Sequence, residues 1–163
     1  MNIDVDGLKF EFPESWRVSK YDEWSFYCNQ FQRQMPGLKA VDLVAVNGSE
    51  AYLIEVKDYS GQGTPKPSDL PQNVAKKVLH TLAALLPASL RANDAEEKAM
   101  AGALLKCRTL RVVLHADNPK TKPYVVDPSD LKQKLKMLLK AVDPHLTVSS
   151  RKNPNHVTWT VHR

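Results

Sequence analysis

Residues 40–59 read AVDLVAVNGSEAYLIEVKDY, and this stretch decides the fold. Two apolar segments flank Asn47-Gly48, a dipeptide typical of tight β-hairpin turns because both residues tolerate positive φ. Side chains two residues apart share a face of a strand, so Glu55 and Lys57 lie on the same face. With Asp42 in the first segment, three charged residues interrupt strands whose pattern otherwise predicts burial.

The length of the hairpin loop sets the relation between the two acids. With the loop at residues 47–50, Asp42 lies directly opposite Glu55, and their Cβ atoms are roughly 5 Å apart. With a shorter loop at residues 47–48, Glu55 lies one diagonal step from Asp42 on the same face. Facing carboxylates repel each other, so both registers indicate a cation between them.

Composition indicates one globular domain over residues 1–163. The acidic, alternating start differs from a secretory leader, and no apolar run reaches membrane-spanning length, so we expect no membrane association. Cys28 and Cys107 stand alone without metal-ligand spacing, which favours a reducing cytoplasm. From Lys120 onward there are nine basic and three acidic residues, whereas residues 1–119 hold 14 and 15. Such a basic half suits a polyanionic partner or simply solubility.

The remaining pattern predicts an α/β protein with a mixed sheet flanked by helices. Pro87 is expected to end the second helix, and Asp94 with Glu97 to cap the third. The predicted elements are a strand at 8–12, a helix at about 19–35, the hairpin 39–46/51–58, helices at 71–86 and 94–107, a strand at 109–116, a helix at 128–142 with an apolar stripe of Leu131, Leu135, Leu138 and Val142, and a final antiparallel pair at 145–150 and 157–163.

An Asp and a Glu on one face, with a Lys two residues past the Glu, suit a phosphodiester-cleaving metal site. Mg²⁺ takes carboxylate oxygens, keeps several waters and accepts a phosphate oxygen. Asp42 and Glu55 supply such oxygens, and Lys57 is placed to orient or deprotonate the attacking water. The alternative is a structural ion pair of Lys57 with Glu55 or Asp42 at a strand end.

The pattern V-D, twelve residues, then E-V-K across a hairpin resembles the PD-(D/E)XK nuclease superfamily. The resemblance implies a restriction-endonuclease-like fold with an αβββαβ core and a Mg²⁺ cofactor, with Mn²⁺ as its substitute. It implies that Asp42, Glu55 and the backbone carbonyl of Val56 bind the metal, while Lys57 assists the water. Val41 replaces the proline of the motif. Many members add an acid from the preceding helix, for which Asp22 and Glu23 are both candidates.

Two further rows of polar residues are candidates for contacts with nucleic acid, although each is more typical of a solvated helix face. The first row, on the helix that follows the motif, is Gln72, Lys76 and His80 with Lys77 beside it. The second row, on the helix at 128–142, is Lys132, Lys136 and Lys140.

These patterns predict a Mg²⁺-dependent endonuclease that hydrolyses phosphodiester bonds, in DNA rather than RNA. The alternative is a catalytically inactive subunit of the same fold that binds nucleic acid or a protein partner. A homodimer or a larger protein assembly is compatible with so small a domain.

Overall fold

The computed structural model describes residues 1–61, 69–120 and 124–163 of the chain. A five-stranded sheet forms its centre, in the order β3-β4-β5-β6-β7. These strands are β3 Arg17–Lys20, β4 Leu43–Asn47, β5 Glu50–Asp58, β6 Thr109–Asp117 and β7 Thr147–Ser149. The strands β3, β4 and β5 are antiparallel neighbours, whereas β5, β6 and β7 run parallel. This is a mixed α/β architecture.

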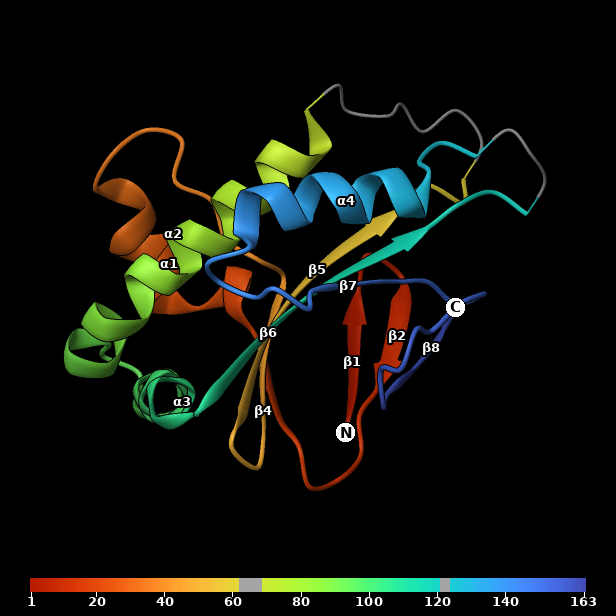
Figure 1. The fold of residues 1–163 in the computed structure, drawn as a ribbon. Coiled ribbons are helices and arrows are strands. Elements are labelled where there is room, and N and C mark those ends of the chain that lie inside the picture. Colours follow the sequence, from red (N-terminus) through yellow and green to blue (C-terminus); the bar gives the residue numbers. More distant parts are fainter. Residues whose placement is uncertain (62–68, 121–123) are drawn as a thin grey trace.

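A smaller antiparallel sheet, in the order β1-β2-β8, packs against one face of the central sheet. Its strands are β1 Asn2–Val5, β2 Leu8–Glu11 and β8 Thr160–His162. The opposite face is covered by α2 Leu70–Arg91, α3 Ala95–Lys106 and α4 Pro128–Leu139. Figure 1 shows the resulting order of layers, with helices, central sheet and small sheet. Both faces of the central hairpin are therefore buried, which explains its almost continuous apolar pattern.

The β4–β5 hairpin has the first of the two registers considered from the sequence. Val46 pairs with Ala51 and Leu43 with Ile54. Asn47 and Glu50 also pair, so the turn itself is Gly48-Ser49, with Gly48 at a φ of +57°. Glycine adopts this left-handed conformation without the steric cost of a Cβ atom.

The predicted helix at 19–35 is wrong, because the chain breaks into short pieces there. After β3 come η1 Tyr21–Glu23, α1 Ser25–Asn29 and η2 Phe31–Arg33. Trp24 interrupts the helix with extended backbone, φ −59° and ψ 132°, and two N–H groups of α1 bond instead to the distant Glu97 carboxylate. A side chain from α3 thus satisfies the amides that a continuous helix would have paired internally.

The helix predicted at 71–86 is longer than expected. It continues through Pro87 to Arg91, because Ala84, Leu85 and Ala88 pack into the core. This burial offsets the backbone hydrogen bond that proline removes. The predicted capping pair of α3 is confirmed in its Asp94 half, since the Asp94 carboxylate accepts from the amides of Glu96 and Glu97. The Glu97 carboxylate accepts instead from the amides of Ser25 and Phe26.

The C-terminal strand pairing predicted from the sequence is also wrong. β7 joins β6 in parallel, while β8 joins β2 in the smaller sheet. On α4 the buried stripe is Leu131, Leu135 and Leu139, and Leu138 is 45% exposed. The stripe keeps strict i, i+4 spacing because one narrow line of α4 packs on the sheet.

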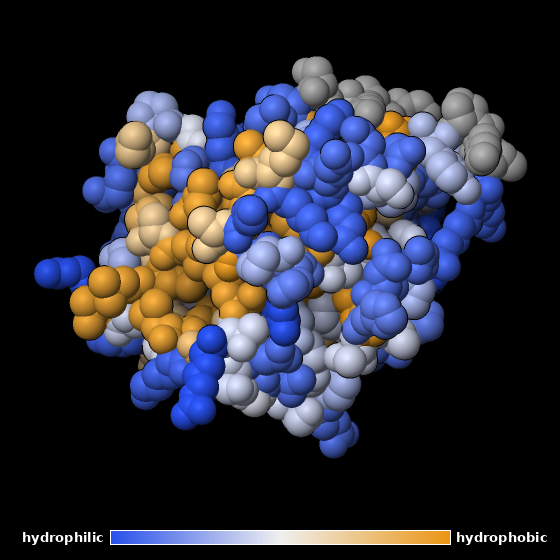
Figure 2. Space-filling model, in the orientation of Figure 1, coloured by the Kyte–Doolittle hydropathy of each residue, from blue (hydrophilic) through white to orange (hydrophobic). Residues whose placement is uncertain are grey.

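Two features of the surface complete the fold. In the described parts of the chain, no helix combines the length and apolar character needed to cross a lipid bilayer. In Figure 2, hydrophobic residues gather where α2 and α3 lie, and hydrophilic residues predominate where α4 lies. The exposed large apolar side chains of α2 and α3 are Leu79, Leu86, Leu90 and Leu105.

The stripe on α4 makes a prediction about stability. We expect Leu135→Ala to lower the free energy of unfolding by about 2–5 kcal/mol, because it leaves a cavity in the core. Leu138→Ala is the matched control, and it should cost much less because that side chain is partly in solvent. Urea unfolding of both variants measures the difference, and equal losses would contradict this packing.

Candidate active site

Asp42 and Glu55 face each other at the end of the central hairpin. Asp42 directly precedes β4, and continuing the register beyond Leu43 and Ile54 places it opposite Glu55. Asp42 is 8% exposed and Glu55 only 1%. Glu55 shares its strand face with Leu53, which packs among the helices. The two carboxylates therefore lie between the sheet and α2, largely withdrawn from water.

Backbone and side-chain contacts hold Asp42 in this place. Its Oδ2 accepts a hydrogen bond of 2.6 Å from the Val56 amide, and its carbonyl accepts one of 2.9 Å from the Tyr21 amide. The segment before it is bound to α2, where Thr81 Oγ1 accepts from the Val41 amide and His80 Nδ1 accepts from the Lys39 amide. α2 thus fixes the approach of the chain to Asp42.

Two ammonium groups converge on the Glu55 carboxylate. Lys57 Nζ lies 2.6 Å and Lys77 Nζ 2.7 Å from Glu55 Oε1, and Lys77 also lies 3.5 Å from Asp42 Oδ1. The ion pair between Lys57 and Glu55 that the sequence left as an alternative is therefore present. Within the described residues, Glu55 Oε2 is buried without a hydrogen-bond partner. Both lysines thus pair with the same oxygen of Glu55, and the other oxygen has no hydrogen-bond partner among the described residues.

The electrostatics of this cluster are those of charges removed from water. Burial, together with the nearby Asp42 carboxylate, raises the pKa of Glu55 to about 7, although Lys77 and Lys57 act to lower it. Burial alone would lower the pKa of Lys77, but Glu55 and Asp42 outweigh it and raise that pKa. The acids and lysines thus depend on one another for their charge states.

The structure separates the two candidate acids of η1. Asp22 has its Oδ1 buried without a hydrogen-bond partner among the described residues, and burial followed by the charge of Asp42 raises its pKa. Glu23 forms an ion pair with Lys20, and its side chain is 63% exposed. Asp22 therefore joins the Asp42 side of the cluster, whereas Glu23 belongs to the surface.

The site contains carboxylate oxygens, the kind of ligand atom that divalent cations such as Mg²⁺ prefer. Asp22 and Glu55 both have a buried carboxylate oxygen without a hydrogen-bond partner among the described residues, and the charge of Asp42 raises the pKa of both. The N–H and C=O groups of one strand residue point to the same side, so the carbonyl of Val56 faces the Asp42 side of β5. In the parts of the chain that the structure describes, no three His, Cys, Asp or Glu side chains form a ready metal-ligand group. The three carboxylates nevertheless outnumber the two ammoniums, which favours an added positive charge.

The residues predicted to contact nucleic acid are distributed over different environments. On α2, Gln72 and Lys76 are exposed, whereas Lys77 belongs to the acid cluster. His80 accepts a hydrogen bond from the Lys39 amide. Lys77 therefore lies within the candidate active site rather than on a solvated row. On α4, the three lysines line an open groove of about 480 Å³ on the outer face of the helix; they are Lys132, Lys136 and Lys140.

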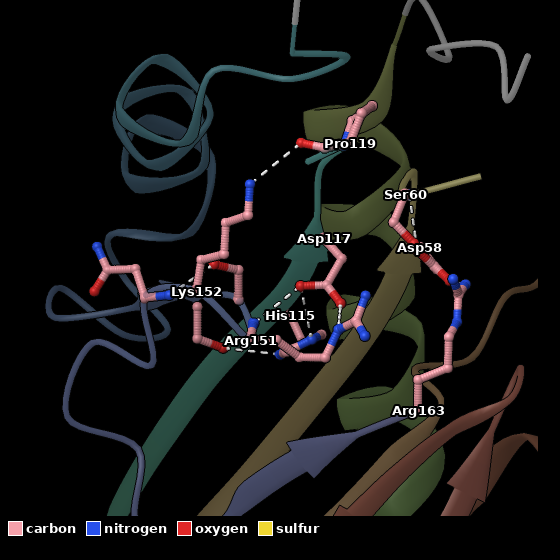
Figure 3. A network of polar contacts seen from close by, with 11 residues as sticks. Asp58, Ser60, His115, Asp117, Pro119, Arg151, Lys152 and Arg163 are labelled. Carbon is pink, nitrogen blue, oxygen red and sulfur yellow. Dashed lines mark hydrogen bonds and ion pairs between the residues drawn. The ribbon is translucent and has the colours of Figure 1, made fainter. Parts of the chain in front are cut away.

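A second polar network, not predicted from the sequence, lies beyond the carboxyl ends of β5 and β6 (Figure 3). Asp117 is 3% exposed, forms an ion pair with Arg151 and lies 3.5 Å from His115 Nε2. Burial opposes its ionisation, but His115 and Arg151 outweigh burial and hold the pKa of Asp117 at about 2. His115 Nδ1 lies 3.4 Å from Ser149 Oγ, and Ser149 is 2% exposed. Asp117, His115 and Ser149 follow the Asp–His–Ser order of a hydrolase triad, but the two ring nitrogens are exchanged relative to it and the hydroxyl is buried, so the group is not a catalytic triad.

Comparison with known proteins gives one informative similarity. No protein-family model and no solved structure matches the chain. A curated relative, the cysteine–tRNA ligase of Neisseria meningitidis serogroup A / serotype 4A, is 33% identical over 147 aligned residues. The match covers 72% of this chain but only 21% of the ligase, so the chain spans about a fifth of that relative's length.

The raised pKa of Glu55 predicts how stability depends on pH. Between the ordinary value of 4.5 and about 7, the folded state holds a proton on Glu55 that the unfolded chain has released. Stability therefore falls as pH rises through this window. We expect the free energy of unfolding to drop by about 2–3 kcal/mol across it, since one pKa unit corresponds to about 1.4 kcal/mol.

Urea unfolding at both ends of that window measures this drop. Glu55→Gln should remove most of it, and Glu14→Gln, which changes an exposed carboxylate, should retain the wild-type drop. A drop of wild-type size in Glu55→Gln would show that another group titrates.

Proposed function

We propose that this protein is a metal-dependent nuclease of the PD-(D/E)XK type that hydrolyses phosphodiester bonds. The observation that carries the proposal is the pair of facing, nearly buried carboxylates of Asp42 and Glu55 with two lysine ammoniums beside them. Such a cluster is costly in a hydrophobic hairpin, because desolvated charges lose several kcal/mol each. A function at the site is a reason for the protein to keep it. Perturbed charge clusters of this kind are typical of functional sites.

Asp42, Glu55 and the Val56 carbonyl would hold a Mg²⁺ or Mn²⁺ ion, and Asp22 is the acid of η1 that would join them. When bound, the ion supplies Lewis-acid polarisation of the phosphate and activation of water. The ligand oxygens come from β5, from the residue that directly precedes β4 and from η1; the sheet and α2 fix the positions of the first two. Rigid strands position ligand atoms better than loops do.

Lys57 and Lys77 have distinct roles in this proposal. The Lys57 side chain is 30% exposed and lies on the same strand face as Glu55, so it can reach a phosphate next to the acids. As an ammonium it would stabilise negative charge that develops on phosphate oxygens while the attacking water bonds to phosphorus and the leaving oxygen departs. Lys77 is less exposed and contacts both acids, so it positions them and offsets their repulsion.

The architecture supports a restriction-endonuclease-like core, with two departures. The order of β3, β4, β5, α2 and β6, with α4 and β7 after it, resembles the αβββαβ order that the motif implies, but an additional helix, α3, lies between α2 and β6. The short helix α1, however, follows β3 instead of preceding it. Asp22 consequently reaches the site from η1, directly after β3, and not from a long helix.

The substrate class is nucleic acid, and the sequence favours DNA. The relative found by comparison is a ligase named for transfer RNA, so RNA belongs beside DNA in every assay. A homodimer or a larger protein assembly remains compatible with the small size of the domain.

A second candidate function is a domain of this type that binds nucleic acid without cutting it. The observation that favours it is the pairing of both lysines with a single oxygen of Glu55, which lets the cluster serve as a structural ion-pair network. The same pairs are compatible with catalysis, because a bound cation would exchange with them.

Cleavage assays test the main proposal. Wild type and the Asp42→Asn, Glu55→Gln and Lys57→Met variants are incubated with labelled DNA and RNA in Mg²⁺ or Mn²⁺. We expect cleavage by wild type and losses of about 10²–10⁴-fold in each variant, the range for removing a group that acts on the reacting atoms. Lys98→Met, on the exposed face of α3, is the control and should cleave as wild type does. Equal cleavage by all five proteins would identify a contaminating nuclease.

Calorimetry separates the two candidate functions. A nuclease should take up Mn²⁺, and both Asp42→Asn and Glu55→Gln should weaken that binding at least about tenfold, because each removes a charged ligand. Glu14→Gln is the matched control. Folded wild type that binds nucleic acid but takes up no Mn²⁺ would favour the non-cutting domain.

A further inference from the structure

A pocket of about 750 Å³ opens beyond the carboxyl ends of β5 and β6, next to the network in Figure 3. In sheets with parallel strands, ligands commonly bind outside the carboxyl ends of the strands. Four basic side chains line the pocket together with one carboxylate, Asp117, and one aromatic ring, Tyr124. The basic residues are Lys120, Arg151, Lys152 and Arg163. Four of the nine basic residues from Lys120 onward thus gather around a concave surface.

The two arginines of the pocket are held in place by acids at the strand ends. Arg151 pairs with Asp117 through Nε, and its backbone amide also donates to Asp117 at 2.9 Å. This contact leaves the terminal nitrogens of the guanidinium as the donors that a ligand would meet. Arg163 pairs with Asp58, the last residue of β5. Guanidinium groups fixed in this way are preorganised to bind phosphate.

The two lysines carry the uncompensated charge. Lys152 Nζ lies 3.1 Å from the Lys120 carbonyl and 5.9 Å from the centre of the Tyr124 ring. Within residues 1–61, 69–120 and 124–163, neither Lys120 nor Lys152 takes part in an ion pair. Tyr124 is 46% exposed, so part of its ring is accessible for stacking.

The pocket lies close to the candidate active site along β5. Glu55 is three residues before Asp58, which corresponds to about 10 Å of strand. Glu55 faces the helices. The pocket lies at the end of the sheet, where its lining includes the end of β6, the first residue of α4 and Arg163 after β8. A polyanion in the pocket would pass over the end of β5 to reach Asp42 and Glu55.

We propose that this pocket binds the backbone of a single nucleic-acid strand that extends to the candidate active site, with Tyr124 stacking on a base. The identity of the ligand rests on the proposed nuclease function, but binding does not require cleavage. Lys120 and Lys152 contact phosphates of the strand, and among the described residues no acid offsets the charges of these two lysines. Arg151 and Arg163 define the position of the strand.

Fluorescence anisotropy tests the proposal with wild type in EDTA, which suppresses metal-dependent cleavage. The probes are labelled single strands of about 12 nucleotides, within the usual site size, as DNA and as RNA, and the matching duplexes. Lys120→Gln/Lys152→Gln should raise the Kd for single strands about tenfold. It should also reduce the slope of log Kd against log salt by about 1.4, because two phosphate contacts are lost.

Two further variants make the result specific. Lys9→Gln/Lys98→Gln removes the same charge from exposed positions on β2 and α3, and should change the Kd less than about twofold. Tyr124→Leu should weaken single-strand binding about tenfold and leave duplex binding unchanged.

The proposal is overturned if wild type binds no probe, if the pocket variant binds as wild type does, or if the Lys9/Lys98 control weakens binding equally. One outcome upholds the pocket and refutes the nuclease. In it the pocket variant binds single strands more weakly than wild type, while wild type and Glu55→Gln cleave nucleic acid equally.

Discussion

The buried carboxylate of Glu55 is the constraint on which the rest of this structure depends. A carboxylate that is 1% exposed on a central strand must be neutralised, and here two lysines share one of its oxygens while Asp42 faces it. Burial favours the protonated acid, and the ammoniums favour the ionised one. The balance leaves Glu55 with a pKa of about 7, so its charge responds to any ion or ligand that arrives.

Helix α2 makes most of the contacts that hold the residues around Glu55 in place. Lys77 reaches from it into the acid pair, while His80 and Thr81, one turn further on, bind amides of the segment that leads to Asp42. One helix therefore supplies both a charge and the backbone contacts that place its partner. Displacing α2 would remove Lys77 from the cluster and break the hydrogen bonds to the segment before β4. The stability of the fold and the geometry of the site are therefore coupled.

Charge is distributed so that the two ends of a bound strand would meet different environments. The acid cluster lies between the sheet and the helices, and the basic pocket with Lys152 and Arg163 lies at the carboxyl end of the sheet, beside the start of α4. Both are reached from the carboxyl end of β5. The pocket would bind the phosphates of the strand. The acids would repel those phosphates unless a cation lay between them, so binding of the strand at the acids would depend on the metal.

The hairpin follows from the sequence alone, because strand alternation and an Asn-Gly turn are local, and either of the two registers considered places Asp42 and Glu55 on one face. The structure selects the register in which the two acids lie directly opposite each other. The sequence also indicated the helix caps and the mixed α/β class. Only the tertiary structure decided that Lys77 enters the cluster, that Asp22 rather than Glu23 turns inward, and that β7 and β8 belong to different sheets. These outcomes depend on which surfaces pack together, and contacts between distant segments override local periodicity when they bury more apolar area or satisfy more polar groups.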